Sequence, residues 1–335
     1  MIKLAIIGYG YWGPNLVRNF FNLNSCAVSV VADTRVERLN LLKKNYPSIK
    51  TTIDVDDIFN DKSVDAVVIA VPVSSHFKLA NKALEKGKHV LVEKPMTFSL
   101  KNAEELISMA KKKKRVLMVD HTFLYTDAVQ KIKLLIDKGE IGKVKYFDST
   151  RINLGLFQKD ANVLWDLAAH DISILLYLVS EKPQTVSATG VSHTKNKIEN
   201  IAFMTLKYKS GLIAHFDCSW SSPVKVRQTL IGGSKKMIVY NDVEPTEKIK
   251  IYDSGYQLKK NKLEVLVDYR TGDIQIPKID LKEGLSSMAS DFLSAIKTGK
   301  KPISDSQLGL EVVKILTLAD QSMKLNGKPV RYEKN

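Results

Sequence analysis

The first 120 residues alternate short apolar runs with amphipathic stretches. Continuous apolar strands separated by helices are typical of a parallel sheet that helices cover on both faces, with right-handed crossovers. The pattern therefore predicts an α/β, doubly wound Rossmann-type domain over residues 1–120. Strands are expected at 3–7, 27–33, 66–71, 89–93 and 115–120, and helices at 14–22, 36–46, 75–86 and 99–113.

After residue 120 the pattern changes to alternating apolar and polar positions, which is typical of strands with one buried face. Turn signals, KSG at 209–211 and GGS at 232–234, separate several such segments. We expect an α+β domain over 121–335 whose large, mainly antiparallel open sheet has one helix-covered face. Helices are expected near 127–138, within 162–174, at 284–297 and at about 306–325, the last packing back on the first domain.

The composition is that of an ordinary globular protein, with 44% hydrophobic and 26% charged residues. The longest apolar run, at 66–71, is too short to cross a bilayer, and no secretory signal pattern opens the chain. Cys26 and Cys218 lie in apolar contexts, which favours buried reduced thiols over a disulfide framework. We therefore expect a cytoplasmic protein without a membrane partner.

The net charge of +15 raises the question of an anionic partner, which for a basic protein is nucleic acid, an anionic surface or an anionic metabolite. Most of the excess is lysine spread along the chain, and KKKKR at 111–115 ends a predicted helix, where cations favour the dipole. No zinc-finger or RNA-binding signature accompanies the charge. We expect no nucleic-acid partner, and an anionic substrate stays open.

A glycine-rich turn, GYGYWG, follows the first predicted strand directly and opens the first predicted helix. Gly8, Gly10 and Gly13 have the G-x-G-x-x-G spacing in the strand–turn–helix context that a dinucleotide site requires, with Tyr11 and Trp12 between them. In that setting the first glycine permits the turn, the second lets a pyrophosphate approach, and the third lets helix and strand pack closely. The motif predicts a dinucleotide cofactor.

Asp33 ends the second predicted strand, 20 residues beyond Gly13. A carboxylate there can accept both hydroxyls of the adenosine ribose and would repel a 2′-phosphate, which favours NAD over NADP. Thr34 and Arg35 follow directly, and an arginine at this point can accommodate a phosphate. NADP therefore remains an alternative.

Taken together, the glycine turn, AVPVSSH at 70–76, VEKP at 92–95, NVLWDLAAHDISI at 162–174 and the C-terminal PISDSQLGLEVVKI are similar to the Gfo/Idh/MocA family of oxidoreductases. The likeness runs from the first strand to the final helix, and the E-K-P and D-x-x-x-H elements are its most specific marks. The forms GYGYWGPNLVRNF, RINLG and NVLWDLAAHDIS resemble the branch of sugar-nucleotide 3-dehydrogenases.

This resemblance implies a Rossmann domain followed by an open-sheet domain, with the nicotinamide between them. It implies that Lys94 is the active-site lysine, that His170 is the catalytic histidine and that Asp166 is the acid one turn before it. It also implies a homodimer or homotetramer that forms through the open sheet. The chain departs from many members at Ala168 and Ala169, where glycines are common, and at Trp165.

The residue chemistry fits hydride transfer from a secondary alcohol. An imidazole can take the hydroxyl proton because its pKa lies near neutrality. A nearby ammonium disfavours protonation of that imidazole and can polarise the substrate oxygen. We expect His170 to act as base, Lys94 to bind the reacting oxygen and Asp166 to fix the geometry. The alternative is that His170 is a buried histidine whose ring is hydrogen-bonded inside the protein and has no catalytic role.

Further candidates surround this core. Val71, Pro72 and Glu93 are expected near the cofactor, and His76 has an equal chance of being structural. Pro95 can impose a cis bond, which the sequence leaves open. Arg151 and Asn153 share a strand face and either bind a phosphate or sugar hydroxyl or form a polar sheet edge. His121 follows the strand at 115–120, where a substrate cleft would open.

No cluster of histidine, cysteine and carboxylate residues has metal-ligand spacing, so no metal is expected. The leading hypothesis is an NAD-dependent dehydrogenase of a sugar or nucleotide sugar, with C3 of a UDP-N-acetylhexosamine or its uronate as one candidate position. The alternatives are an NADP-linked sugar or polyol (inositol-type) enzyme and, of another class, a regulatory protein that senses NAD without turnover.

Overall fold

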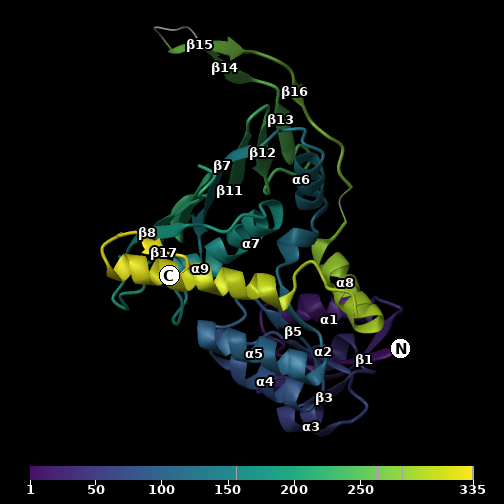
Figure 1. Cartoon of the computed structure of the whole chain (residues 1–335). Helices are drawn as coiled ribbons and strands as arrows, with labels where there is room; N and C mark the ends of the chain where they lie inside the picture. The colour runs from purple at the N-terminus through teal and green to yellow at the C-terminus, as the bar shows by residue number, and fades with distance from the viewer. Residues whose placement is uncertain (156, 261–264, 281, 334–335) are drawn as a thin grey trace. The chain divides into compact units, whose positions relative to one another are not determined.

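A computed structural model of the chain describes residues 1–155, 157–260, 265–280 and 282–333. The described residues form two compact units, and the chain passes between them more than once (Figure 1). The first unit holds residues 1–126 and 282–317, and the second holds residues 127–281 and 318–335. Each unit has its own sheet and its own hydrophobic core, so each is described separately below.

The first unit is built on a parallel sheet with the strand order β3–β2–β1–β4–β5–β6. Each neighbouring pair in this order runs parallel. β1, β4 and β5 lie in the middle and are almost wholly buried, which explains their unbroken apolar sequences. The strands are β1 Ile2–Ile7, β2 Cys26–Ala32, β3 Lys50–Thr52, β4 Ala66–Ile69, β5 His89–Glu93 and β6 Leu117–Asp120.

Helices cover both faces of this sheet, as the alternating pattern predicts. On one face α1 packs against β2 and α8; on the other face α4 and α5 lie side by side, with α4 against β4 and β5 and α5 against β6 (Figure 1). Lys114, in the left-handed conformation with φ of 53°, ends α5 after its lysine-rich last turn. The helices are α1 Gly13–Phe21, α2 Val36–Asn45, α3 Val55–Asn60, α4 His76–Glu85, α5 Leu100–Lys113 and α8 Gly284–Thr298.

The sequence pattern did not predict β3 or α3. β3 is three residues long, KTT, and α3 is six residues long, VDDIFN, so neither is long enough to show a period. Asp54 caps α3 by accepting a hydrogen bond from the backbone N–H of Asp56 at 2.8 Å. The loop from β3 to α3 becomes one wall of the pocket described below.

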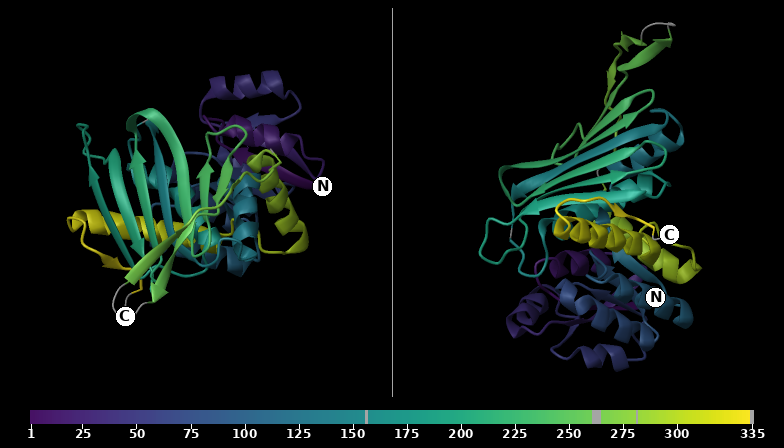
Figure 2. Two further views of the ribbon diagram at one scale, coloured as in Figure 1. Left: turned by 90° about the horizontal axis from the view of Figure 1, so that it is seen from above. Right: turned by 60° about the vertical axis from the view of Figure 1, so that its left-hand side comes forward.

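The second unit contains a wide sheet with the order β16–β13–β12–β11–β7–β10–β9–β8–β17 (Figure 2). Its pairings are antiparallel except for β7 with β10, which run parallel, so the prediction of a mainly antiparallel sheet is confirmed. β14 and β15 pair only with each other among the described residues. The strands are β7 Val144–Leu154, β8 Thr185–Val191, β9 Ile201–Lys207, β10 Ile213–Ser219, β11 Ser221–Gly233, β12 Met237–Asn241, β13 Ile249–Tyr252, β14 Gly255–Lys260, β15 Val265–Arg270, β16 Ile274–Gln275 and β17 Val330–Arg331.

One face of this sheet is covered and the other is open. Along β7, Phe147, Ser149 and Arg151 are buried toward the helices α6 Asp127–Asp137 and α7 Ala169–Leu178, which pack on each other. The alternate residues Asp148 and Thr150 are partly exposed on the opposite face. This period of two confirms the prediction that helices cover one face of the sheet.

The last helix, α9 Ser306–Lys324, contributes to both units. Its first half belongs to the first unit, where Gly309 packs closely against Val119, and its end belongs to the second, where Ser322 accepts a hydrogen bond from the backbone N–H of Ala188 at 2.9 Å. Cys26 and Cys218 are buried free thiols, and burial raises the pKa of each. Among the described residues, no helix is long and apolar enough to cross a bilayer.

Candidate active site

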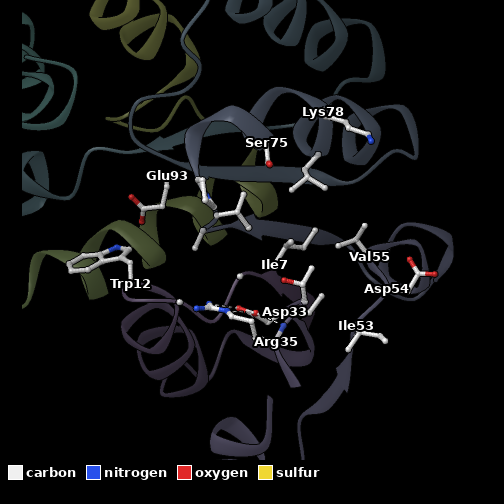
Figure 3. A pocket seen from close by; sticks show the side chains of 18 of the residues that line it. Ile7, Trp12, Asp33, Arg35, Ile53, Asp54, Val55, Ser75, Lys78 and Glu93 are labelled. Atoms are coloured by element: carbon white, nitrogen blue, oxygen red, sulfur yellow. Dashed lines mark hydrogen bonds and ion pairs between the residues drawn. The ribbon is translucent and has the colours of Figure 1, made fainter. Parts of the chain in front are cut away.

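The first unit has a pocket of about 890 Å³ at the carboxyl ends of its strands. In open α/β sheets this edge, at the point where the strand order reverses around β1, is where ligands bind. Figure 3 shows Glu93 and Trp12 at one end of the pocket, Ile53 and Asp54 at the other, and Asp33 with Arg35 between them. Of the sequence-predicted cofactor residues, the lining includes Gly8, Gly10, Tyr11, Trp12, Asp33, Thr34, Arg35, Val71, Pro72, Glu93 and Lys94.

Two glycines are required by the turn that forms the pocket floor. Gly8 has φ of +101°, and a Cβ there would lie 2.2 Å from the carbonyl oxygen of Ala70. A Cβ on Gly13 would lie 2.3 Å from the carbonyl oxygen of Gly8, so the start of α1 can approach β1 only without a side chain. At Gly10 the nearest atom is Nη2 of Arg35 at 3.4 Å, and the backbone there faces open pocket.

Asp33 is nearly buried at the end of β2 and is held by nitrogen donors on both oxygens. The backbone N–H of Tyr9 donates to Oδ2 at 2.7 Å, and the Arg35 guanidinium donates to Oδ1 and Oδ2, each at 3.1 Å. Burial would raise the pKa of this carboxyl, but the hydrogen bonds from Arg35 and Tyr9 outweigh it, so the pKa is lowered and Asp33 is a carboxylate. Half of the Arg35 side chain remains exposed.

The far wall of the pocket comes from residues that sequence reasoning missed. They lie on the loop after β3, on α3, and on α4 with the turn before it. Neither β3 nor α3 was predicted from the sequence. An available signal was the S-S-H-F-K segment at 74–78, which spans the start of α4, because a helix start after a strand commonly faces such a pocket. The residues are Ile53, Asp54, Val55, Asp56, Phe59, Ser75, Lys78, Leu79 and Lys82.

His76 does not line the pocket but contacts two of the loops that form it. The side chain is fully buried, with Nδ1 3.1 Å from the carbonyl oxygen of Pro95 and Nε2 2.9 Å from that of Val71. It thereby ties the loop after β4 to the loop after β5. The Lys94–Pro95 bond in the latter loop is cis, which answers the question that the sequence left open.

Glu93 and Lys94 mark the end of β5 and the end of the pocket opposite the β3–α3 loop. Glu93 lies beside Asp120, its register partner at the end of β6. Burial, followed by the negative charge and hydrogen bonding of Asp120, raises the pKa of Glu93 well above its ordinary value, although Lys94 opposes the shift. Trp12 Nε1 donates to Asp120 at 3.4 Å, which links the glycine turn to this pair.

His121, a predicted substrate residue, is 1% exposed and does not line the pocket. Neither of its ring nitrogens has a hydrogen-bond partner among the described residues. Burial, with a smaller contribution from the positive charge of Lys94, lowers its pKa to about 3. The ring is therefore neutral throughout the physiological pH range.

In the second unit, Asp166 and His170 lie on one continuous helical segment. Leu164–Ala168 forms a π-helical turn that runs directly into α7. Among residues 162–175, only Asp166 and His170 are not buried. The apolar sequence around them is therefore core, and both polar side chains are directed away from it on the same side. Such π-helical turns occur frequently at functional sites.

Polar contacts hold the first turn of this segment. Asn162 Oδ1 accepts from the backbone N–H of Leu164 at 3.1 Å and of Trp165 at 3.4 Å, which caps the helix start. Trp165 Nε1 donates to Asp320 at 2.8 Å, so the unusual tryptophan anchors the segment to α9. Trp220, which sequence reasoning missed, donates from Nε1 to Asp166 Oδ2 at 3.0 Å.

Arg151 and Asn153 have different environments, although they share a face of β7. Arg151 is 3% exposed, and its Nε and Nη2 each donate to an oxygen of Asp171 at 2.7 Å. Asn153 is partly exposed nearer the end of the strand. Asp171 follows His170 directly. The ion pair therefore attaches the helix that carries the histidine to β7.

The first-unit pocket has the features that a dinucleotide needs. The open backbone at Gly10 can admit a pyrophosphate, Asp33 presents a carboxylate at the end of β2, and Glu93 leaves a buried Oε1 without a partner among the described residues. In the described part of the chain, no group of three or more histidine, cysteine or carboxylate side chains could hold a metal ion.

Comparisons with known proteins agree with this geometry. Residues 2–121 match the profile of an oxidoreductase family with an NAD-binding Rossmann fold, and residues 129–239 match the GFO/IDH/MocA C-terminal domain. The chain is 26% identical to a UDP-N-acetylglucosamine 3-dehydrogenase of Acidithiobacillus ferrooxidans, covering 93% of this chain and 94% of that one. It is 23% identical to a myo-inositol 2-dehydrogenase of Thermotoga maritima, covering 90% of each.

Solved structures show the same fold. The structure of the UDP-N-acetylglucosamine 3-dehydrogenase from Acidithiobacillus ferrooxidans superposes with a TM-score of 0.82 at 23% identity, covering 96% of this chain and 98% of that one. The predicted fold class is thereby confirmed. With both of its domains matched and a dinucleotide pocket at the carboxyl edge of its parallel sheet, the chain belongs to the Gfo/Idh/MocA family of NAD(P)-binding oxidoreductases.

Proposed function

We propose that this oxidoreductase is an NAD-dependent dehydrogenase of a sugar or nucleotide-sugar secondary alcohol. The observation that carries the proposal is the pocket itself, which has a ribose-binding carboxylate, Asp33, on one side of the glycine turn and Glu93 with Lys94 on the other. A dinucleotide whose adenosine ribose is bound by Asp33 extends past Gly10 toward Lys94. The nicotinamide, when bound at that end, supplies the acceptor for the hydride.

The choice of NAD over NADP rests on Asp33. Its carboxylate can accept the ribose hydroxyls, and it would repel a 2′-phosphate. Arg35 is already engaged by Asp33 at 3.1 Å, so its charge is largely committed to that pair. An NADP-linked sugar or polyol enzyme remains the second candidate, because half of the Arg35 side chain is exposed and a rotation would free its guanidinium.

The chain's own residues divide the remaining chemistry of alcohol oxidation. In the proposal, His170 takes the hydroxyl proton of the substrate, and Lys94 binds the oxygen as it becomes a carbonyl. Asp166 orients the histidine or the substrate, and Trp220 fixes Asp166 through its indole N–H. The partial exposure of Asp166 and His170 within a buried helix supports this role, since a satisfied core histidine would be buried with its neighbours.

Two residues named as substrate ligands take supporting roles in this proposal. Arg151 holds Asp171, the residue after His170, through two hydrogen bonds. His121 is a buried neutral ring directly after Asp120. Asn153 stays a candidate for a sugar hydroxyl, because it is partly exposed and carries both a donor and an acceptor.

The names of two relatives support the proposed substrate class. One is named for oxidation of UDP-N-acetylglucosamine at position 3, and another for oxidation of myo-inositol at position 2. The net charge of +15 is compatible with an anionic nucleotide sugar but does not require one, and C3 of a UDP-N-acetylhexosamine or its uronate is the leading candidate. A non-catalytic NAD sensor is disfavoured because both Lys94 and His170 are retained.

We also propose that the chain forms a homodimer or homotetramer through the open face of its wide sheet. The face bears apolar side chains beside polar ones, including Ile152, Val226 and Leu230, and no helix of the described residues packs on it. Light scattering coupled to size-exclusion chromatography gives the subunit count. A lysine substitution at Leu230 should shift it toward monomer.

The direct test of the reaction is to incubate the pure protein with NAD and with a panel of sugar nucleotides, inositols and free sugars while following nicotinamide reduction. Reduction with a UDP-N-acetylhexosamine or its uronate supports the leading candidate. Reduction only with inositols or only with NADP would favour the second candidate. Tight cofactor binding without any reduction across the panel would favour the sensor.

A further inference from the structure

Glu93 and Asp120 form a close pair of acids beside the pocket. β5 ends at Glu93 and β6 ends at Asp120, and the two residues are partners in the register of these parallel strands. Register partners on neighbouring strands direct their side chains to the same face of a sheet, so the two carboxyl groups lie side by side, and Asp120 is 3% exposed. Glu93 also lines the pocket, next to Lys94.

Two carboxylates side by side in a buried site repel each other, which favours a proton on one of them. The donors around the pair indicate which one carries it. Asp120 accepts one hydrogen bond from the Thr122 hydroxyl and another from Trp12 Nε1. Among the described residues, Glu93 accepts a hydrogen bond from the backbone N–H of Lys94 at 3.3 Å, and its buried Oε1 has no donor.

The other charged or titratable groups beside the pair act in opposite directions. Lys94 carries a positive charge and favours ionisation of Glu93, whereas burial and the charge of Asp120 oppose it and outweigh Lys94. His121, directly after Asp120, contributes no charge because burial keeps its ring neutral. Glu93, whose pKa is raised, is therefore the carboxyl of the pair that holds a proton more readily than an ordinary glutamate.

We propose that Glu93 and Asp120 share one proton and that the binding of oxidised cofactor to the pocket releases it, whereas reduced cofactor does not. This inference rests on the proposed use of the Glu93–Lys94 end for the nicotinamide. The oxidised nicotinamide ring is a cation and the reduced ring is neutral. A cation beside the pair favours the form in which both carboxyl groups are ionised. The protonated protein and NAD⁺ therefore give the complex and one free proton.

Proton release is measured by isothermal titration of NAD⁺ and of NADH into the full-length protein in buffers of different ionisation enthalpy, from about pH 6 to about pH 9. We expect NAD⁺ binding to release up to one proton, with a maximum below the pKa of Glu93 in the unliganded protein, and to tighten as pH rises by up to about tenfold per pH unit. NADH binding should release distinctly fewer protons and vary less with pH.

Two substitutions separate the proton from the charge. Glu93→Gln removes the titrating group, and Asp120→Asn removes the neighbouring negative charge but leaves burial, so it should lower the pKa of Glu93 without restoring its ordinary value. Counted per NAD⁺ bound at neutral pH, Glu93→Gln should abolish the proton release, and Asp120→Asn should reduce it below that of the wild type. Asp54→Asn is the matched control, because it removes a carboxylate from the opposite end of the same pocket while an asparagine keeps the cap of α3.

Infrared spectra of the unliganded proteins give an independent readout. The wild type should show the carbonyl band of a buried protonated carboxyl at neutral pH, and Glu93→Gln should lack it. The inference is overturned if that band is absent from the wild type, if Glu93→Gln releases as many protons as the wild type, or if NAD⁺ binds without proton release at every pH. If NAD⁺ does not bind at all, the proposed function fails. If NAD⁺ binds without proton release, this inference fails and the proposed function stands.

Discussion

Arg151 on β7 forms a two-point ion pair with Asp171 on α7, with both N–O distances at 2.7 Å and both side chains 3% exposed. Asp171 is the neighbour of His170, so the wide sheet fixes the helix that presents the proposed base. A planar guanidinium matches a carboxylate at two points, which sets orientation as well as position.

Arg151→Met should therefore affect both stability and turnover. Breaking a buried ion pair leaves an uncompensated carboxylate, which typically costs ~3–5 kcal/mol in the free energy of unfolding. Urea denaturation measures that loss, and the double variant Arg151→Met/Asp171→Leu should recover a large part of it because no lone charge is left. Cofactor affinity, which depends on the other unit, should not change. Equal stability of Arg151→Met and wild type would contradict this role.

The two glycines Gly8 and Gly10 should respond differently to alanine. Gly8→Ala forces a Cβ to 2.2 Å from the backbone oxygen of Ala70 at positive φ, so we expect misfolding or a large loss of stability. Gly10→Ala meets only a flexible arginine tip at 3.4 Å, so the fold should remain within ~0.5 kcal/mol of wild type. Its NAD affinity should nevertheless fall by roughly tenfold or more, since the added methyl blocks the pyrophosphate. Thermal unfolding and cofactor titration report the two effects separately.

Asp33 should control the choice between NAD and NADP. Asp33→Ser removes the carboxylate that repels a 2′-phosphate and frees Arg35 to bind one. The ratio of NADP to NAD affinity should rise by roughly tenfold or more, equivalent to at least about 1.4 kcal/mol. Arg35→Ala in the Asp33→Ser background should reverse much of the gain. A wild-type enzyme that already prefers NADP would contradict the assignment.

His121 should make the fold sensitive to acid. Its pKa is about 3 in the folded protein and about 6.5 in the unfolded chain, so the unfolded state takes up a proton first as pH falls. The stability associated with the neutral ring is fully present above about pH 6.5 and is lost progressively as pH falls toward 3. Between pH 6.5 and 4.5 the loss should reach about 2–3 kcal/mol.

His121→Gln is the variant that isolates this effect. His89, whose pKa burial lowers to about 4, contributes acid sensitivity to both proteins, so the difference between wild type and variant reports His121 alone. Urea unfolding at pH 7 and pH 4.5 gives the comparison. An unchanged pH dependence in the variant would mean that the ring is protonated or solvated in the folded state.

Much of this architecture was predictable because its signals are local. The unbroken apolar strands predicted a parallel sheet, and the glycine spacing with Asp33 predicted most of one side of the pocket. The polar pair Asp166 and His170 could be singled out as an exception in an apolar helix. The cis bond at Pro95 was only one of two options until the structure showed it.

The features that escaped prediction depend on contacts between distant segments. β3 and α3 are too short to show a period, so the wall around Asp54 was missed. Nothing near Arg151 in the sequence identifies Asp171 as its partner, and nothing near Asp166 identifies Trp220. The acid pair of Glu93 and Asp120 could have been suspected, because both residues end adjacent parallel strands.

The central claim is that His170 and Lys94 act on the same hydroxyl during hydride transfer. The most direct test is single-turnover reduction of NAD with the best substrate of the panel, in wild type, His170→Ala, Lys94→Ala and the double variant, with NAD affinity measured in each. The account predicts a rate loss of ~10²–10⁴-fold for His170→Ala at unchanged NAD affinity, a comparable loss for Lys94→Ala, and a double variant far less impaired than the product of the two. Wild-type rates in His170→Ala would contradict it.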